Sequence, residues 1–259
     1  MNAAQKFNWP GWLVFGAALL VWEIGARGTP HLQLYFPPIS QILGALARAI
    51  SSGSLTQHGA ATVGRFLQGY LLAAALAVTL GVVLGYFRFL HGLLATVIEL
   101  LRPMPSVAII PVAILLLGIG DAMIVAVTVY AALWPVLINT IDGVRNIDAT
   151  LIDTGRTFGL GRGRILWQII LPGASPYIVT GLRIGLSIAL ILVTTAEMIA
   201  GSKGLGFYIL DEERGMNSAN MYAGIVVVAL MGYLLNRLFL MLEARAMRWR
   251  HGMIARGTA

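Results

Sequence analysis

The chain has 259 residues, of which 58% are hydrophobic and only 11% are charged, and its mean hydropathy is +0.81. Soluble globular domains carry about 25% charged residues, so this composition excludes an ordinary water-soluble domain. The formal net charge of +7 does not indicate a nucleic-acid-binding protein, because the basic residues lie in short gaps between apolar blocks rather than in one stripe with aromatic side chains.

Six apolar blocks follow one another along the chain, and about 20 helical residues match the roughly 30 Å of hydrocarbon in a bilayer. The blocks cover residues 12–26, 66–87, 93–118, 122–141, 178–200 and 221–242. They predict an all-α, polytopic membrane protein with about six transmembrane helices. A secretory signal is the alternative for the first block, because Lys6 precedes it, but Trp12, Trp22 and Glu23 favour an anchored helix.

The distribution of basic residues predicts the orientation, since cytoplasmic loops are enriched in Lys and Arg. One side of the six-helix arrangement holds Lys6, Arg88, Arg145, Arg156, Arg162, Arg164, Arg245, Arg248, Arg250 and Arg256, and the other holds Arg27, Arg48, Arg65, Lys203 and Arg214. We therefore expect both termini and the loop 142–175 in the cytoplasm. The predicted division is an N-terminal helix with an extracytoplasmic segment (1–65), a core transmembrane domain (66–242) and a basic cytoplasmic tail (243–259).

Residues 39–50 follow a Pro-Pro pair and place apolar side chains at near-helical spacing. This pattern predicts an amphipathic helix that lies along the extracytoplasmic surface of the membrane. Glycine pairs at four-residue spacing occur in two of the blocks, Gly81 with Gly85 and Gly181 with Gly185. Such pairs let helix backbones approach closely, and packing within the chain is the simplest interpretation.

The third block, 93–118, contains several prolines and is expected to be kinked, because each proline removes a backbone donor. Glu99 and Arg102 lie three residues apart on one helical face, so a local ion pair is expected. In an alternative hypothesis, Arg102 supplies positive potential toward an anionic substrate.

The loop 142–175 is too long and too patterned to be a simple turn. Asp148 can cap a short helix that runs to Gly159, where glycines permit a sharp turn. A second short helix, 164–170, is expected to end at Leu171-Pro172-Gly173. Such a pair of helices could insert into a groove on another protein. Equally, the loop could rest on anionic lipid through Arg156, Arg162, Arg164 and Trp167.

The same loop resembles the signature of bacterial ATP-binding-cassette importer permeases, which reads EAA, three residues, Gly, nine residues, Ile, one residue, Leu-Pro. In this chain Asp153, Thr154 and Gly155 stand in place of the EAA triplet, and Gly159, Ile169, Leu171 and Pro172 follow at the full spacing. The triplet departs from the pattern by a shorter acidic arm and by residues of lower helix propensity.

Further segments resemble the nitrate, sulfonate and taurine branch of these permeases. They are FPPISQIL, ELLRPMPSVAIIPVAILLLGIG, GLRIGLSIAL and AEMIAGSKGLGF, and the resemblance covers residues 35–242. It implies a type I importer permease fold in a bacterial inner membrane and a small, anionic solute as substrate.

The resemblance also implies partners: a second permease copy, with a homodimer expected, two separate ATPase subunits, and an extracytoplasmic substrate-binding protein. Coupling to the ATPase would rest on Asp153, Thr154, Gly155, Gly159, Ile169, Leu171 and Pro172. The chain lacks the phosphate-binding sequence G-x-x-x-x-G-K-[ST], so ATP and Mg²⁺ are expected on the partner and no cofactor on this chain.

Two further residues are candidates for the transport path. Glu197 lies late in the block 178–200, where a charged side chain is energetically costly at membrane depth unless it is paired. Two interpretations remain: a structural ion pair, or a role at the outer gate. Arg183 lies about 21 Å away along the same helix and cannot be its partner. Like Arg102, Arg183 could instead attract an anionic substrate.

Other functional classes receive less support. The sequence has no cysteine for a disulfide or thiolate site and no H-E-x-x-H motif, and its four histidines are scattered, so we expect neither a metal site nor catalysis. The alternative to an importer subunit is an independent channel or secondary transporter, which typically shows two related halves.

Overall fold

A computed structural model describes residues 9–29, 31 and 33–247, and all regular structure in those ranges is helical. Five helices or helix runs there are long and apolar enough to span a membrane: α1 (Trp9–Gly28), α3 (Ser54–Tyr86), α6 (Asp121–Arg145), the run Arg162–Ala200 that ends in α9 (Leu171–Ala200), and α11 (Ser218–Ala246). A bent pair raises the number to six if it counts as one span. The predicted all-α membrane fold is confirmed.

The bent pair is the proline-rich third block. α4 (Arg88–Leu101) is followed by a 3₁₀ turn, η2 (Ser106–Ile109), and by α5 (Ile110–Leu117), and the two halves meet at 90°. The predicted kink is therefore confirmed. Glu99 and Arg102 form no ion pair in this structure, so that expectation is wrong; both side chains are exposed, where pairing gains little against the lost side-chain entropy.

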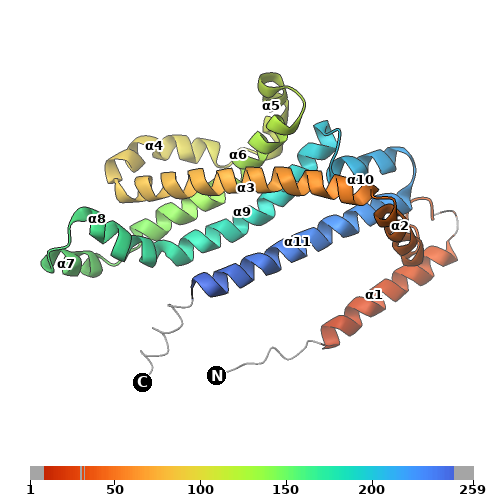
Figure 1. The fold of residues 1–259 in the computed structure, drawn as a ribbon, viewed down its shortest axis with the longest axis horizontal. Coiled ribbons are helices and arrows are strands. Elements are labelled where there is room, and N and C mark those ends of the chain that lie inside the picture. Colours follow the sequence, from red (N-terminus) through yellow and green to blue (C-terminus); the bar gives the residue numbers. More distant parts are fainter. Residues whose placement is uncertain (1–8, 30, 32, 248–259) are drawn as a thin grey trace.

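The centre of the fold is the packing of α3, α6 and α9 side by side (Figure 1). A Cβ on Gly81 would lie 2.6 Å from Cβ of Thr140, and one on Gly185 would lie 2.9 Å from Cγ2 of Val136. Both neighbours are on α6. The glycine pairs therefore serve packing within the chain, as expected, and hold three spans at close range.

Short helices cap the two ends of these spans (Figure 1). α2 (Ile39–Ser51) and α10 (Leu205–Arg214) lie at one end, and α7 (Ala149–Thr157) and α8 (Arg162–Ile165) at the other. α2 buries Ile42 and exposes Leu43, so its predicted amphipathic character is confirmed.

Two predicted boundaries are wrong. α3 begins at Ser54, so residue 65, the predicted end of the N-terminal segment, lies inside a spanning helix. At the other end, no break occurs at Leu171-Pro172-Gly173, because α8 continues through a π-helical turn, η3 (Leu166–Ile170), directly into α9. Proline is tolerated there because it stands in the first turn of α9. In the predicted tail, residues 243–246 belong to α11, and 248–259 lie outside the described residues.

Candidate functional site

The loop between α6 and α9 is built by local capping. The Asp148 carboxylate accepts a 2.8 Å hydrogen bond from the backbone N–H of Thr150, as predicted, and this bond holds the pKa of Asp148 below its usual value. α7 then ends at the predicted elbow, where Gly159 has a φ of +74° and the N–H of Leu160 donates to the carbonyl of Gly155 at 3.0 Å. The backbone at residue 159 therefore favours glycine.

The signature residues divide into an inner and an outer set. Gly155 is buried, and a Cβ there would lie 2.6 Å from Cδ1 of Ile169, so these two positions pack α7 against the π-turn. By contrast, Asp153 and Thr154 are exposed, and Asp153 pairs at 3.0 Å with the equally exposed Arg156. A Cβ at residue 155 would require the end of the Ile169 side chain to shift.

The outer surface of the loop is apolar and basic. Phe158 is 81% exposed and Trp167 is 72% exposed, although both belong to an ordered, capped unit. Arg162 and Arg164 are exposed beside them. Large aromatic side chains on a rigid helical pair are typical of surfaces that enter a groove on a partner.

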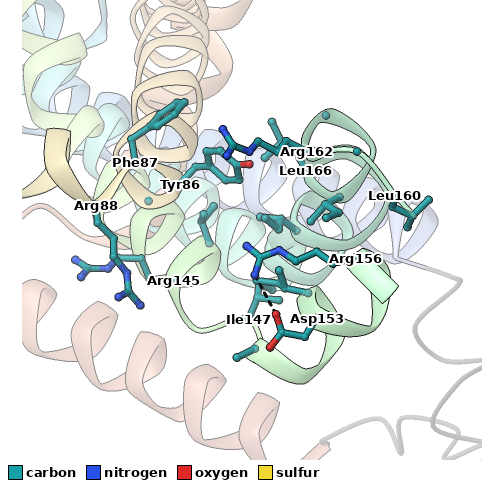
Figure 2. Close-up of a pocket in the computed structure, with 18 residues that line it drawn as sticks. Tyr86, Phe87, Arg88, Arg145, Ile147, Asp153, Arg156, Leu160, Arg162 and Leu166 are labelled. Carbon is teal, nitrogen blue, oxygen red and sulfur yellow. Dashed lines mark hydrogen bonds and ion pairs between the residues drawn. The ribbon is translucent and has the colours of Figure 1, made fainter. Parts of the chain in front are cut away.

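A cleft of about 1080 Å³ separates this loop from the ends of α3 and α6 (Figure 2). Its described lining includes one carboxylate, Asp153, and four arginines: Arg88, Arg145, Arg156 and Arg162. The cleft therefore carries a positive charge of its own.

A second polar cluster lies at the far end of α9. Glu197 is fully buried, and its carboxylate accepts hydrogen bonds from Nη1 of Arg65 at 2.8 Å, from Oγ1 of Thr62 at 2.8 Å and from the N–H of Gly206 at 3.1 Å. Arg65 also pairs with Asp121, at 2.7 Å. The ion-pair interpretation of Glu197 is thus confirmed, whereas a gate role stays a prediction.

The segment after α9 wraps around this carboxylate. A Cβ on Gly204, which has a φ of +116°, would overlap the Glu197 carboxylate, and a Cβ on Gly206 would overlap the carbonyl of Thr194. The N–H of Gly204 donates to Nδ1 of His58 at 3.1 Å. These glycines permit a loop to close over a buried charge that would otherwise be poorly solvated.

Sequence reasoning missed Thr62, Arg65 and His58, because all three were placed outside the membrane helices. The pairing of Arg65 with Glu197 joins residues 132 positions apart, which no local pattern reveals. The signal that was present is the cost of a lone membrane acid, which requires a basic or polar partner.

The three predicted path residues do not converge. Arg183 pairs with Glu243 of α11, Arg102 is exposed, and Glu197 belongs to the cluster with Arg65. The residues that the structure describes contain no group of three or more His, Asp or Glu side chains that could hold a metal ion.

Known proteins resemble this chain over most of its length. The family model for the inner membrane component of binding-protein-dependent transport systems matches residues 42–248. A putative ABC transporter permease protein of Methanocaldococcus jannaschii is 32% identical over 241 residues, 91% of this chain and 90% of that one. The taurine transport system permease protein of Escherichia coli K12 is also 32% identical, covering 91% and 87%.

Two more matches extend the comparison. A nitrate import permease protein of Synechocystis is 30% identical over 184 residues, 71% of this chain and 67% of that one. A chain of the MetNI methionine ABC transporter in an inward-facing conformation has the same fold, with a TM-score of 0.61 and 20% identity, covering 72% and 92%.

Proposed function

The chain belongs to the family of binding-protein-dependent transport system inner membrane components, and on that premise we propose that α7 and α8 dock a separate ATPase whose action drives import. The chain itself is a transport subunit of the inner membrane rather than an enzyme.

The observation that carries the docking proposal is the exposed pair Phe158 and Trp167 on a capped, closed loop. Exposing such side chains to water is unfavourable, and a groove on a protein partner would bury both. Gly155 and Ile169 hold the two short helices against each other from within, so the surface would be presented without a large ordering cost on binding.

The continuous helix from Arg162 to Ala200 supports a mechanical link. Because the π-turn joins α8 to α9 without a break, a displacement of the docked loop would move α9 as one rod. Its other end carries Glu197, which ties α9 to α3 and to the first turn of α10. Closure of the ATPases on ATP would therefore bias the membrane helices between inward-open and outward-open states.

The substrate and the remaining partners follow from the relatives. Those named for taurine, aliphatic sulfonates and nitrate support a small anion of this kind as the solute. The proposed complex holds a second copy of the chain, two ATPases with their ATP and Mg²⁺, and an extracytoplasmic binding protein. The basic α7–α8 end and both termini would face the cytoplasm.

A pull-down of the tagged full chain from detergent-solubilised membranes tests this proposal. We expect an ATPase to co-purify, identified by its phosphate-binding sequence and by ATP hydrolysis, and to be lost in Phe158→Glu and Trp167→Glu. Tyr35→Glu, an exposed aromatic outside the loop, is the matched control and should retain it. A wild-type chain that purifies without an ATPase would favour the channel or secondary-transporter alternative.

A further inference from the structure

Two arginines of the cleft are not used by the docking surface. Arg88 is the first residue of α4, directly after the spanning helix α3 ends, and Arg145 is the last residue of the spanning helix α6. In Figure 2 both side chains point away from α7 and α8. Both therefore stand at the membrane end of the cleft, where lipid headgroups begin.

Neither of these two arginines is neutralised. The ion pairs found within residues 9–29, 31 and 33–247 include neither Arg88 nor Arg145. Arg145 does contact the His91 ring, at 3.0 Å from Nη1 to either ring nitrogen, which places it beside the first turn of α4. The one carboxylate in the cleft lining, Asp153, is taken by Arg156.

Apolar side chains surround this charge on the membrane side. Phe87 and Phe89 flank Arg88 in the sequence and are exposed, Phe89 by 80%, and α4 has no buried residue along its length. Phenylalanine side chains are typical of apolar faces at the boundary between headgroups and acyl chains, and an exposed apolar helix beyond them suits acyl chains. The unpaired charge and the apolar surface together fit an amphiphile with an anionic headgroup.

We propose that Arg88, Arg145 and His91 bind the phosphate group of an anionic membrane lipid, whose acyl chains lie along α4. Paired guanidinium groups match a phosphate through charge-assisted hydrogen bonds. The bound lipid would brace the α3–α4 turn against the end of α6, immediately behind the loop that is proposed to dock the ATPase. This lipid site depends on the proposed function in one respect only, which is the orientation that places the two arginines on the cytoplasmic side of the membrane.

Native mass spectrometry of the purified full chain tests this site. The chain is reconstituted in nanodiscs of phosphatidylcholine with phosphatidylglycerol and released from them, and retained phosphatidylglycerol is counted. We expect retention to fall about fivefold for each arginine removed, in Arg88→Gln and Arg145→Gln. Arg48→Gln and Arg214→Gln, at the other end of the spans, are the controls and should retain the lipid.

Two further measurements distinguish a lipid phosphate from inorganic phosphate, and a lipid ligand from a protein partner. Inorganic phosphate at millimolar concentration should leave the thermal unfolding midpoint of the chain unchanged, whereas phosphatidylglycerol should raise it for the wild type and not for the double variant. A midpoint raised equally by inorganic phosphate would overturn the lipid assignment. So would unchanged lipid retention in the double variant together with loss of the co-purifying ATPase, which would assign the arginines to the protein interface.

Discussion

The two ends of the helix run Arg162–Ala200 differ in whether contacts within one chain pair the polar groups and cover the apolar side chains. At the Glu197 end, a fully buried carboxylate has three donors from this chain, one of which is the cationic Arg65. At the α7–α8 end, Phe158 and Trp167 are exposed on a capped, closed loop. The Glu197 carboxylate is therefore satisfied within the isolated subunit, whereas the α7–α8 end leaves large aromatic side chains exposed, as the docking proposal requires.

Breaking the buried pair should have the largest effect. Glu197→Ala leaves the buried Arg65 with only the exposed Asp121 as an ionic partner, and we expect the free energy of unfolding to fall by about 3–5 kcal/mol. The thermal unfolding midpoint in detergent should drop by roughly 10 °C. Asp121→Ala is the matched control, because Asp121 contacts the same arginine but is 74% exposed, and it should cost far less. Equal losses in the two variants would contradict the account.

A methyl group at Gly206 should have the next largest effect. The new Cβ would overlap the carbonyl of Thr194, and such overpacking costs about 1–3 kcal/mol. The same change at Gly163, in α8, meets nothing within 4 Å and should be neutral or slightly stabilising, because alanine favours helix. Unfolding midpoints of the two variants check this, and a Gly206→Ala protein as stable as wild type would show that the α9–α10 loop can relax.

Substitutions at the Gly159 elbow test the exposed end of the helix run. No atom lies within 4 Å of a Cβ at residue 159, so only the positive φ restricts this position within the chain. Gly159→Val should lower the conformational stability of the loop by about 1–2 kcal/mol. Gly159→Asn should lower it less, because asparagine tolerates a positive φ. ATPase co-purification should follow the same order. Equal loss with both residues would mean that the partner contacts position 159 directly.

The smallest effect should come from the cap of α7. The pKa of Asp148 is lower in the folded chain than when unfolded, owing to its bond from the Thr150 N–H, so its contribution is present above the unfolded pKa and is lost as pH falls through the folded pKa. The protection factors of the α7 amides, which are corrected for the slower intrinsic exchange in acid, should therefore fall as the pH is lowered. Asp148→Asn caps without a charge and should remove this pH dependence; a variant with the wild-type profile would assign the change to another group.

Much of this contrast was visible in the sequence. Hydropathy indicated the spans, the prolines of the third block predicted its bend, and Asp148 and Gly159 predicted the cap and elbow of α7. Leu151 lies on that helix and Phe158 directly follows it, but the sequence alone does not show that both face outward.

The buried end could not be predicted, for two physical reasons. The first turns of α3, from Ser54 to Gly64, are polar enough to lower the local hydropathy, so the helix start and the location of Arg65 were hidden. The pairing of Arg65 with Glu197 is a tertiary contact without a local pattern. Similarly, Pro172 suggested a helix stop, but the preceding π-turn brings it into the first turn of a longer helix.

The most direct test of the central claim is a site-specific cross-link from the tip of the loop. The sequence contains no cysteine, so Phe158→Cys carries a unique thiol for a photoactivatable reagent in intact membranes, with Tyr35→Cys as the control. We predict a covalent adduct between residue 158 and an ATP-hydrolysing subunit, and none from residue 35. An adduct only with lipid at residue 158 would contradict the claim and make the loop a membrane-surface element.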